Sequence, residues 1–420
     1  MNLPRSGWCL ALALLTCLPL ARADDPQPES PLRFPGPVEA ARYGFIHDDW
    51  LDCRRITIQE TQPGELTLSG AVTDLDSCER AFRLARAWEG VTRVKGRLDI
   101  DKAPQGTQIV TPLMKTLRAN FLSRAYPVLV EHDAQGVLTL RGELPTCGAR
   151  DLVLMMAKRV HGVQAVMNDI SLRMKPRSDA DIHDTIARLF AMQTAADLRA
   201  VTVKVKDACV ELVGTVPSPA DLCVAEHLAG IGGVILVDAG RLKIHWERQA
   251  GPAGKAPLEG TSVPASAPRA KDSLKEDIAL LLAEDPCFAG VPGVRFEVEV
   301  EPGRPVLVTG EVPCLAASRH AEMLVRHVRG VHDLRFRVSQ AVTEADDFAL
   351  NHKVSAIVSA TAGLERMRAE TAGMRVTLIG YADPKRCDYA RELVECIPGV
   401  IDVTVVVPRA HPKPEGTQRK

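Results

Sequence analysis

The feature that most constrains how this 420-residue chain folds is a pair of glycines that recurs five times at an almost constant interval. In each copy, one glycine ends a strand-like run such as LTLRG, and the glycine of a Gly-Val pair follows it further along the chain. The glycines that end the runs are Gly70, Gly142, Gly214, Gly310 and Gly380, and those of the Gly-Val pairs are Gly90, Gly162, Gly233, Gly330 and Gly399. An interval that is kept in five copies indicates internal repeats, each of them a small supersecondary unit.

The residues around the two glycines predict the elements of each unit. Between the glycines, apolar residues recur at helical spacing, as Ala317, Ala321, Leu324 and Val328 do in the fourth copy. The Gly-Val glycine ends this helix, because glycine adopts the left-handed conformation without steric cost. An alternating strand follows the helix, while two strands joined by a turn, and before them another amphipathic helix, precede the first glycine.

The order of elements in each unit is therefore α-β-β-α-β over about 65–70 residues. Two helices are expected to pack on one face of a three-stranded sheet, which gives an α+β fold of five tandem units. A unit of this size buries only a small core, so contacts with neighbouring units should add to its stability.

This pattern resembles the BON domain, a family named for bacterial osmotic-stress and nodulation proteins. The resemblance rests on the V-x-L-x-G strand end, the helix after it, and the Gly-Val-x-x-V helix exit that leads into the last strand. Asn168 of the second copy matches an asparagine that the family often has after that valine. The other copies depart from the pattern at this position, where they carry Lys95, Asp238, Arg335 and Thr404.

The spacing also predicts where the units and the linkers lie. The interval from Gly214 to Gly310 is clearly longer than the interval between any other two successive strand-end glycines. The extra length contains a stretch rich in Pro, Ala, Gly and Ser, which is typical of a flexible linker. The predicted segments are a disordered linker at 24–39, BON-like units at 40–103, 104–175, 176–248, 271–341 and 342–408, the flexible linker at 249–270, and a disordered tail at 409–420.

Residues 1–23 have the pattern of a secretory signal peptide. Arg5 precedes a short apolar run, and the small-residue site Ala21-Arg22-Ala23 follows it. Cleavage after this site would leave Asp24 as the N-terminus and place the protein in the periplasm. A competing interpretation is a lipoprotein cleavage box that leaves Cys17 lipidated, although Thr16 stands where that box favours glycine or alanine.

Charge and aromatic content exclude one class of partner. The formal net charge is −1, and aromatic residues make up 4% of the chain. A nearly neutral protein creates no field that recruits nucleic acid, and so few aromatic residues cannot line a groove that stacks bases. Nucleic acid is therefore not an expected partner. The basic C-terminal tail is interpreted as a solvated terminus, with contact to anionic lipid as the alternative.

Cysteine usage predicts disulfides, because nine cysteines follow the signal segment and export places them in an oxidising compartment. Cys53 and Cys287 lie where the first helix of their units is expected to end, close to Cys78 and Cys314 at the start of the second helix. We therefore predict the pairs Cys53–Cys78 and Cys287–Cys314, each stabilising its unit by about 2–4 kcal/mol. The connectivity of the other five stays open; they are Cys147, Cys209, Cys223, Cys387 and Cys396, and the second and the last are interpreted as buried apolar residues.

No residue pattern indicates a catalytic centre, a cofactor site or a metal site. The chain has no Walker loop, no HExxH motif and no Cys-x-x-Cys spacing. His320, His327 and His332 surround the second helix of the fourth copy, and we interpret them as solvent-exposed side chains beside its apolar stripe. Metal ligation by these histidines would need a nearby carboxylate and inward geometry. An enzymatic activity, a cofactor and a bound metal are therefore not expected.

Two functions from different classes remain open. The resemblance to BON domains implies a non-enzymatic exported protein that binds the bacterial envelope, either a phospholipid surface or an envelope protein, through repeated weak contacts. The alternative is a protein–protein scaffold, because similar small αββαβ domains stand in tandem in ring subunits of bacterial secretion systems. Those subunits normally carry a membrane span, and no segment after Ala23 is long and apolar enough to form one.

Overall fold

The computed structural model describes residues 32–407, except for 49, 102–108, 134–135, 161, 175, 249–270, 302, 341–345, 362–363, 365 and 382–383. Within the described ranges, the chain forms five units that repeat one order of elements. The predicted signal peptide, the predicted linker at 249–270 and the predicted tail at 409–420 lie outside the described residues.

Each unit consists of a first helix, two strands, a second helix and a last strand. The first unit contains α1 (Pro37–His47), the short η2 (Cys53–Arg55), β2 (Ile56–Gln62), β3 (Glu65–Val72), α2 (Leu75–Ala87) and β4 (Arg93–Ile100). The second contains α3 (Val110–Ala119), the short α4 (Phe121–Ala125), β5 (Val128–His132), β6 (Val137–Leu144), α5 (Cys147–Lys158) and β7 (Ala165–Leu172). The third contains α6 (Asp179–Met192), β8 (Val201–Lys206), β9 (Cys209–Val216), α7 (Pro219–Ala229) and β10 (Leu236–Ile244).

The last two units repeat the same order. The fourth contains α8 (Lys271–Glu284), β12 (Arg295–Glu299), β13 (Val306–Val312), α9 (Leu315–Arg326) and β14 (Leu334–Gln340). The fifth contains α10 (Asp347–Ala360), β15 (Met367–Ala372), β16 (Arg375–Gly380), α11 (Pro384–Glu395) and β17 (Asp402–Val406).

The strands of each unit form a three-stranded mixed sheet, with the second strand of the unit in the middle. In the second unit, for example, β5 runs antiparallel to β6, and β7, which returns after α5, runs parallel to it. The prediction of an α+β fold with five αββαβ units is therefore confirmed.

Side-chain alternation along the middle strands explains why helices cover one face of each sheet. In β6, Leu138, Leu140 and Leu144 are completely buried, whereas Arg141 and Glu143 are exposed. Successive side chains of a strand point to opposite faces, so the leucines pack under the helices and the charged side chains lie on the outer face. Burying one such leucine contributes about 1.5–3 kcal/mol.

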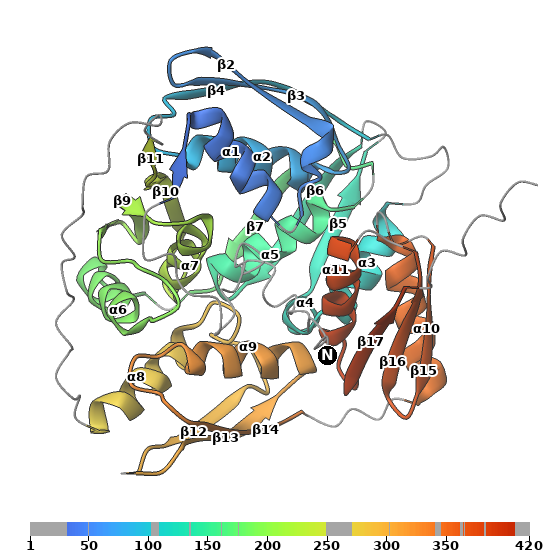
Figure 1. Ribbon diagram of the computed structural model, residues 1–420. Coiled ribbons are helices and arrows are strands. Elements are labelled where there is room, and N and C mark those ends of the chain that lie inside the picture. The colour runs from blue at the N-terminus through green and yellow to red at the C-terminus, as the bar shows by residue number, and fades with distance from the viewer. Residues whose placement is uncertain are drawn as a thin grey trace, which may run out of the picture.

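The second helices of the units gather towards the centre of the molecule, and the sheets of the first, fourth and fifth units lie at its periphery (Figure 1). The packing does not follow chain order alone, because α3 of the second unit packs against α10 of the fifth. Likewise, α6 of the third unit packs against α8 of the fourth. The units before and after residues 249–270 are thus joined directly by helix contacts.

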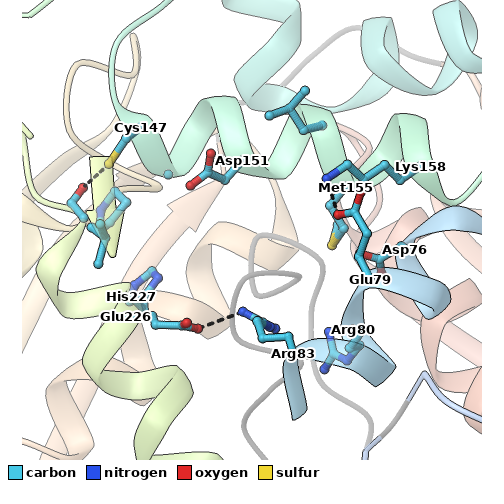
Figure 2. Close-up of a pocket in the computed structure, with 15 residues that line it drawn as sticks. Asp76, Glu79, Arg80, Arg83, Cys147, Asp151, Met155, Lys158, Glu226 and His227 are labelled. Atoms are coloured by element: carbon cyan, nitrogen blue, oxygen red, sulfur yellow. Dashed lines mark hydrogen bonds and ion pairs between the residues drawn. The ribbon is translucent and has the colours of Figure 1, made fainter. Parts of the chain in front are cut away.

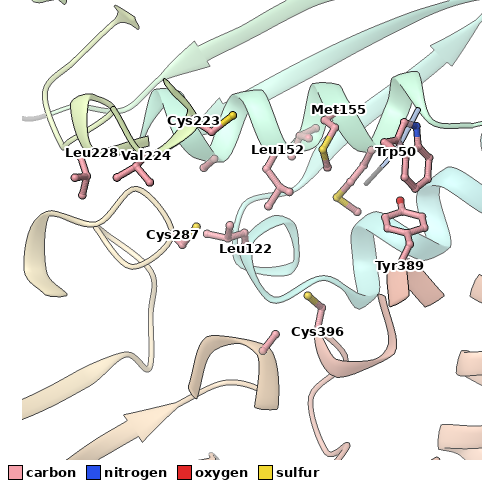
Figure 3. Close-up of a cluster of buried hydrophobic side chains, with 14 of the residues drawn as sticks. Trp50, Leu122, Leu152, Met155, Cys223, Val224, Leu228, Cys287, Tyr389 and Cys396 are labelled. Atoms are coloured by element: carbon pink, nitrogen blue, oxygen red, sulfur yellow. The ribbon is translucent and has the colours of Figure 1, made fainter. Parts of the chain in front are cut away.

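All five units contribute to one contiguous cluster of buried apolar side chains. Figure 3 shows part of this cluster, in which Trp50, Leu152, Cys223, Cys287 and Tyr389 come from the first to the fifth unit in that order. The small cores of the single units therefore continue into a shared core, which supplies the stabilising contacts that units of this size need.

The end of the predicted disordered linker at 24–39 is ordered, so that part of the prediction is wrong. β1 (Arg33–Phe34) pairs in parallel with β11 (Glu247–Arg248), which follows the third unit, and α1 begins at Pro37. Phe34 packs against three aromatic side chains of the first and third units. The composition around Phe34 suggested disorder, but the aromatic partners that hold it come from distant parts of the chain.

Nine of the ten repeated glycines, all except Gly142, hold backbone conformations that other residues adopt only at a cost. All five Gly-Val glycines have a φ between 82° and 101°. At Gly70 the φ is 124°, and a Cβ added there would lie 2.1 Å from the carbonyl oxygen of Arg55. At Gly90 a Cβ would meet no atom within 4 Å. Glycine is thus required for space at the strand end and for backbone conformation at the helix exit.

We expect Gly70→Ala to destabilise the protein more than Gly90→Ala does. Gly90→Ala should lower the free energy of unfolding by about 1–2 kcal/mol, because only the left-handed backbone opposes the new methyl group. Gly70→Ala adds a clash with the backbone of Arg55. Urea unfolding followed by circular dichroism measures both effects. Equal midpoints for the two variants would show that the close approach at Gly70 has no energetic importance.

Candidate functional site

An aromatic and cationic contact lies where the first, second and fifth units meet, and we call it the Trp50 joint (Trp50, Arg159, Arg386 and Tyr389). The Trp50 ring lies between two guanidinium groups, that of Arg159 at 3.8 Å and that of Arg386 at 3.6 Å from the ring centroid. The Tyr389 ring meets the Trp50 ring edge-on, with centroids 4.5 Å apart. All four side chains are buried. One indole therefore binds groups from two other units.

Carboxylates of the first unit hold the two arginines of the Trp50 joint. Arg159 Nε donates to Asp76 at 2.7 Å, and Arg386 Nη2 lies 3.4 Å from Asp74. Asp74 also caps the N-terminus of α2 and accepts a hydrogen bond from Trp50 Nε1 at 3.1 Å. Burial alone lowers the pKa of Arg159, but the charge of Asp76 outweighs it and raises this pKa above the ordinary value. The buried guanidinium is therefore charged and paired, as a buried charge has to be.

Replacing Trp50 by alanine should lower the free energy of unfolding by about 3–5 kcal/mol, because it removes a buried aromatic side chain and uncovers two guanidinium groups. Phe348→Ala is the matched control, since Phe348 is 83% exposed and its loss should change stability by less than about 0.5 kcal/mol. Urea unfolding of both variants makes the comparison. A small effect of Trp50→Ala, similar to that of the control, would contradict a structural role for the joint.

A cleft of about 290 Å³ lies between the first three units and reaches Pro286 of the fourth. Figure 2 shows two ion pairs across it. Arg83 of α2 lies 2.9 Å from Glu226 of α7, and Lys158 of α5 lies 2.6 Å from Glu79 of α2. These charged side chains bind one another across the unit boundaries, so the cleft is lined by inter-unit contacts.

Cys147 lines the same cleft, and burial keeps its thiol in the protonated form. It begins α5 beside the N-cap Thr146, whose hydroxyl donates to the Pro286 carbonyl at 2.9 Å. Cys147 Sγ lies 3.6 Å from the Gly230 carbonyl oxygen. Burial raises the pKa of the thiol to about 12, so it stays protonated at neutral pH. The thiolate is the reactive species, and the protonated thiol of Cys147 instead contacts the third unit, while Thr146 beside it contacts the fourth.

The histidines of the fourth unit differ in part from the prediction. His332 is exposed, but His327 is half-buried and His320 is completely buried. The prediction of a solvent-exposed His320 is therefore wrong. It failed because α9 packs against other units on more than one side, and the apolar stripe of a single helix does not reveal those contacts.

His320 belongs to a buried polar group that the sequence did not predict, and we call it the His–Asp–His cluster (His227, Asp285 and His320). Asp285 follows α8, and its Oδ2 lies 2.8 Å from His227 Nε2 of α7. His320 Nε2 of α9 lies 3.0 Å from each Asp285 oxygen. Burial by itself raises the pKa of Asp285, but the two histidines outweigh it and hold this pKa well below its usual range.

The sequence did not predict the cluster, because its three residues do not occur at equivalent positions in the other units. His227 and His320 belong to two different units, and Asp285 stands in a connection between a helix and a strand. The one available signal was that His320 lies in the helix between two glycine markers, where most neighbours are apolar.

The nine described cysteines are buried or half-buried in the structure. Cys287 and Cys314 are buried, whereas Cys53 and Cys78 are half-buried. Of the cysteines without a predicted partner, four are buried and one is half-buried; the buried ones are Cys147, Cys223, Cys387 and Cys396, and the half-buried one is Cys209. The pairs Cys53–Cys78 and Cys287–Cys314 stay predictions.

We expect protein isolated from an oxidising compartment to contain the Cys53–Cys78 and Cys287–Cys314 peptides in cross-linked form. Each bond would remove entropy from the unfolded chain of a unit with a small core. Non-reducing peptide mapping after alkylation of free thiols detects the bonds. Cys209, which is half-buried and has no predicted partner, serves as the internal control and should be alkylated. Alkylated Cys287 in the folded, oxidised protein would contradict its assigned pair.

None of the helices in the described part of the chain combines the length and the apolar character that a bilayer crossing requires.

Comparison with known proteins assigns the units to a family. The BON domain family matches residues 44–102, 114–174, 178–243 and 271–340, which together exceed half of the chain. The chain belongs to the BON domain family. The fifth BON-like unit lies outside the matched segments, yet it has the same order of elements and the same three-stranded sheet.

Two further similarities are more limited. The osmotically-inducible protein Y of Escherichia coli (strain K12) is 30% identical over 122 residues, which span 27% of this chain and 60% of that protein. The C-terminal domain of CdsD, a structural protein of the type III secretion system of Chlamydia trachomatis, is 13% identical over 46% of this chain and 91% of that chain. Its TM-score of 0.14 carries no argument about this protein.

Proposed function

We propose that this multi-BON protein is exported to the periplasm and binds the bacterial envelope at an anionic phospholipid surface, without catalysing a reaction. The observation that carries the proposal is the match of four units to the BON family, which is associated with phospholipid surfaces. The signal-like residues 1–23 support export. The buried, protonated Cys147 thiol and the paired charges of the cleft support a binding role over an enzymatic one.

The outer sheet face of the first unit has the charge that an anionic surface would attract. Arg93, Lys95 and Arg97 alternate along β4, an edge strand, so their side chains lie on one face. These side chains are 69%, 44% and 89% exposed. The residues of β2 in the same rows, Thr57 and Gln59, are uncharged. Two carboxylates lie on this face, Glu65 at 2.8 Å from Lys95 and Asp99 at 3.1 Å from Arg97, so three cations stand against two anions and the face keeps a net positive charge. Each cation near an anionic membrane contributes about 1 kcal/mol to binding.

The fourth unit offers a matched control face at the opposite side of the molecule in Figure 1. Arg335 and Arg337 alternate along β14 as the cations of β4 do. In the same sheet, however, Glu299 and Glu297 of β12 lie level with Arg335 and Arg337, because each glutamate and its arginine pair with the same residue of the middle strand β13. Carboxylates therefore balance the cations on this face, which should bind an anionic surface weakly.

Sedimentation with vesicles tests the proposal. The chain that begins at Asp24 should bind phosphatidylglycerol vesicles and not phosphatidylcholine vesicles, and the bound fraction should fall as salt increases. Reversing the charge of the three β4 cations with Arg93→Glu, Lys95→Glu and Arg97→Glu should lower the affinity for phosphatidylglycerol vesicles at least tenfold. The control Arg335→Glu with Arg337→Glu should lower it less than threefold.

Each other outcome changes the conclusion. An equal loss of vesicle affinity in the two variants would contradict the assignment of lipid binding to the first unit. Absence of binding to either vesicle would contradict the lipid function itself. Size-exclusion chromatography with light scattering of the same samples examines the alternative, a protein–protein scaffold. A stable oligomer combined with no lipid binding would favour the scaffold over the proposal.

A further inference from the structure

We propose that the His–Asp–His cluster binds one divalent transition-metal ion of the zinc type, which links the third unit to the fourth. Within the described residues, these three side chains form a group whose ligand atoms all lie within 4.8 Å of one another, and all three are buried. Two imidazoles and one carboxylate are a donor set that zinc accepts. The inference does not depend on lipid binding.

The distances within the cluster are close to those that a metal requires. A tetrahedral zinc ion holds its ligand atoms at about 2.0–2.1 Å and therefore about 3.3 Å from one another. The nitrogens of the two histidines lie 2.8 Å and 3.0 Å from the Asp285 carboxylate oxygens. The nitrogen–oxygen distances would thus have to widen by about half an ångström or less, and all the ligand atoms already lie within 4.8 Å of one another.

The two imidazole rings also have a suitable arrangement. The rings of His227 and His320 have centroids 5.6 Å apart and an interplanar angle of 86°. Two imidazoles bound through nitrogen to one tetrahedral ion have centroids about 5 Å apart, since the nitrogen lies about 1.1 Å from the ring centre. The Nε2 atoms of both rings face the same carboxylate, so one ion can contact all three groups.

The surroundings allow both histidines to present a lone pair to the ion. Without a metal, Nε2 of both rings donates to the Asp285 carboxylate, whereas neither Nδ1 atom has a hydrogen-bond partner. A proton can therefore reside on Nδ1 while Nε2 binds the metal, without loss of an existing hydrogen bond at Nδ1. The Asp285 carboxylate is oriented by the backbone N–H of Cys287, which donates to Oδ1 at 2.9 Å. Such support from a neighbouring group is typical of metal-binding carboxylates.

The position of the cluster gives a bound ion a structural role. His227 also lines the cleft between the first three units, and its side chain is 1% exposed, so the cluster lies directly behind the wall of the cleft. The cluster crosses the boundary between the third and fourth units, which Arg177 and Glu284 also bridge at 2.7 Å. An ion bound there adds its binding free energy to the association of units on the two sides of residues 249–270.

Metal titration of the tag-free chain that begins at Asp24 tests the inference. After treatment with a chelator and buffer exchange, we expect it to bind one equivalent of Zn²⁺ by elemental analysis and to unfold at a higher temperature with Zn²⁺ than with chelator. Co²⁺ in place of Zn²⁺ should give the visible absorption of a tetrahedral site. No bound equivalent, or no tetrahedral Co²⁺ spectrum, would overturn the inference, because both are measured on the unmodified, folded protein.

Variants show whether the metal occupies the proposed site. His227→Gln and His320→Gln should each weaken Zn²⁺ binding at least tenfold and abolish the tetrahedral Co²⁺ spectrum. His332→Gln is the matched control, because His332 is an exposed histidine of the same unit and should leave both properties unchanged. Circular dichroism first establishes that each variant is folded. Equal metal binding by folded His320→Gln and by the control would place the metal elsewhere and overturn the assignment.

Discussion

Trp50 lies between guanidinium groups of two other units, and the arrangement of the whole array depends on this contact. Arg159 reaches the ring from the second unit and Arg386 from the fifth. Two cations of like charge can approach one ring only if carboxylates are near, and Asp74 and Asp76 of the first unit supply them. Stacking and ion pairing therefore act together, and removal of either leaves buried charges uncompensated.

A second group of buried charged side chains lies at the boundary between the third and the fourth unit. Asp285 connects α8 to the histidines of α7 and α9 and is completely enclosed. An apolar contact of the same size is non-directional and allows units to slide, whereas a paired buried charge is satisfied in one arrangement only. The two polar sites fix the positions of repeats whose apolar cores are similar to one another. This specificity explains why a chain of similar units adopts a defined packing.

The position of the second helices determines which faces of the units lie at the outside of the molecule. The helices α2, α5, α7, α9 and α11 lie towards the centre, whereas the sheets of the first, fourth and fifth units lie at the periphery (Figure 1). These faces differ in charge from one unit to another, although the units share one fold. The proposed lipid contact therefore uses one repeat, while the other repeats supply structural contacts.

The sequence by itself determined the unit and its number of copies. Regular glycine spacing and apolar periodicity report on contacts within one unit, so five αββαβ units were predictable, including the one that lies outside the family match. Only the tertiary structure decided which units touch. Trp50 and Arg386 come from the first and the last unit, His227 and Asp285 come from the third and the fourth, and no periodicity relates such positions. The sequence neighbours of His320 are those of an ordinary helical residue. Its burial beside the Asp285 carboxylate arises from contacts with elements outside its own helix. Local patterns encode the fold of each repeat, whereas contacts between repeats depend on side chains that occur once.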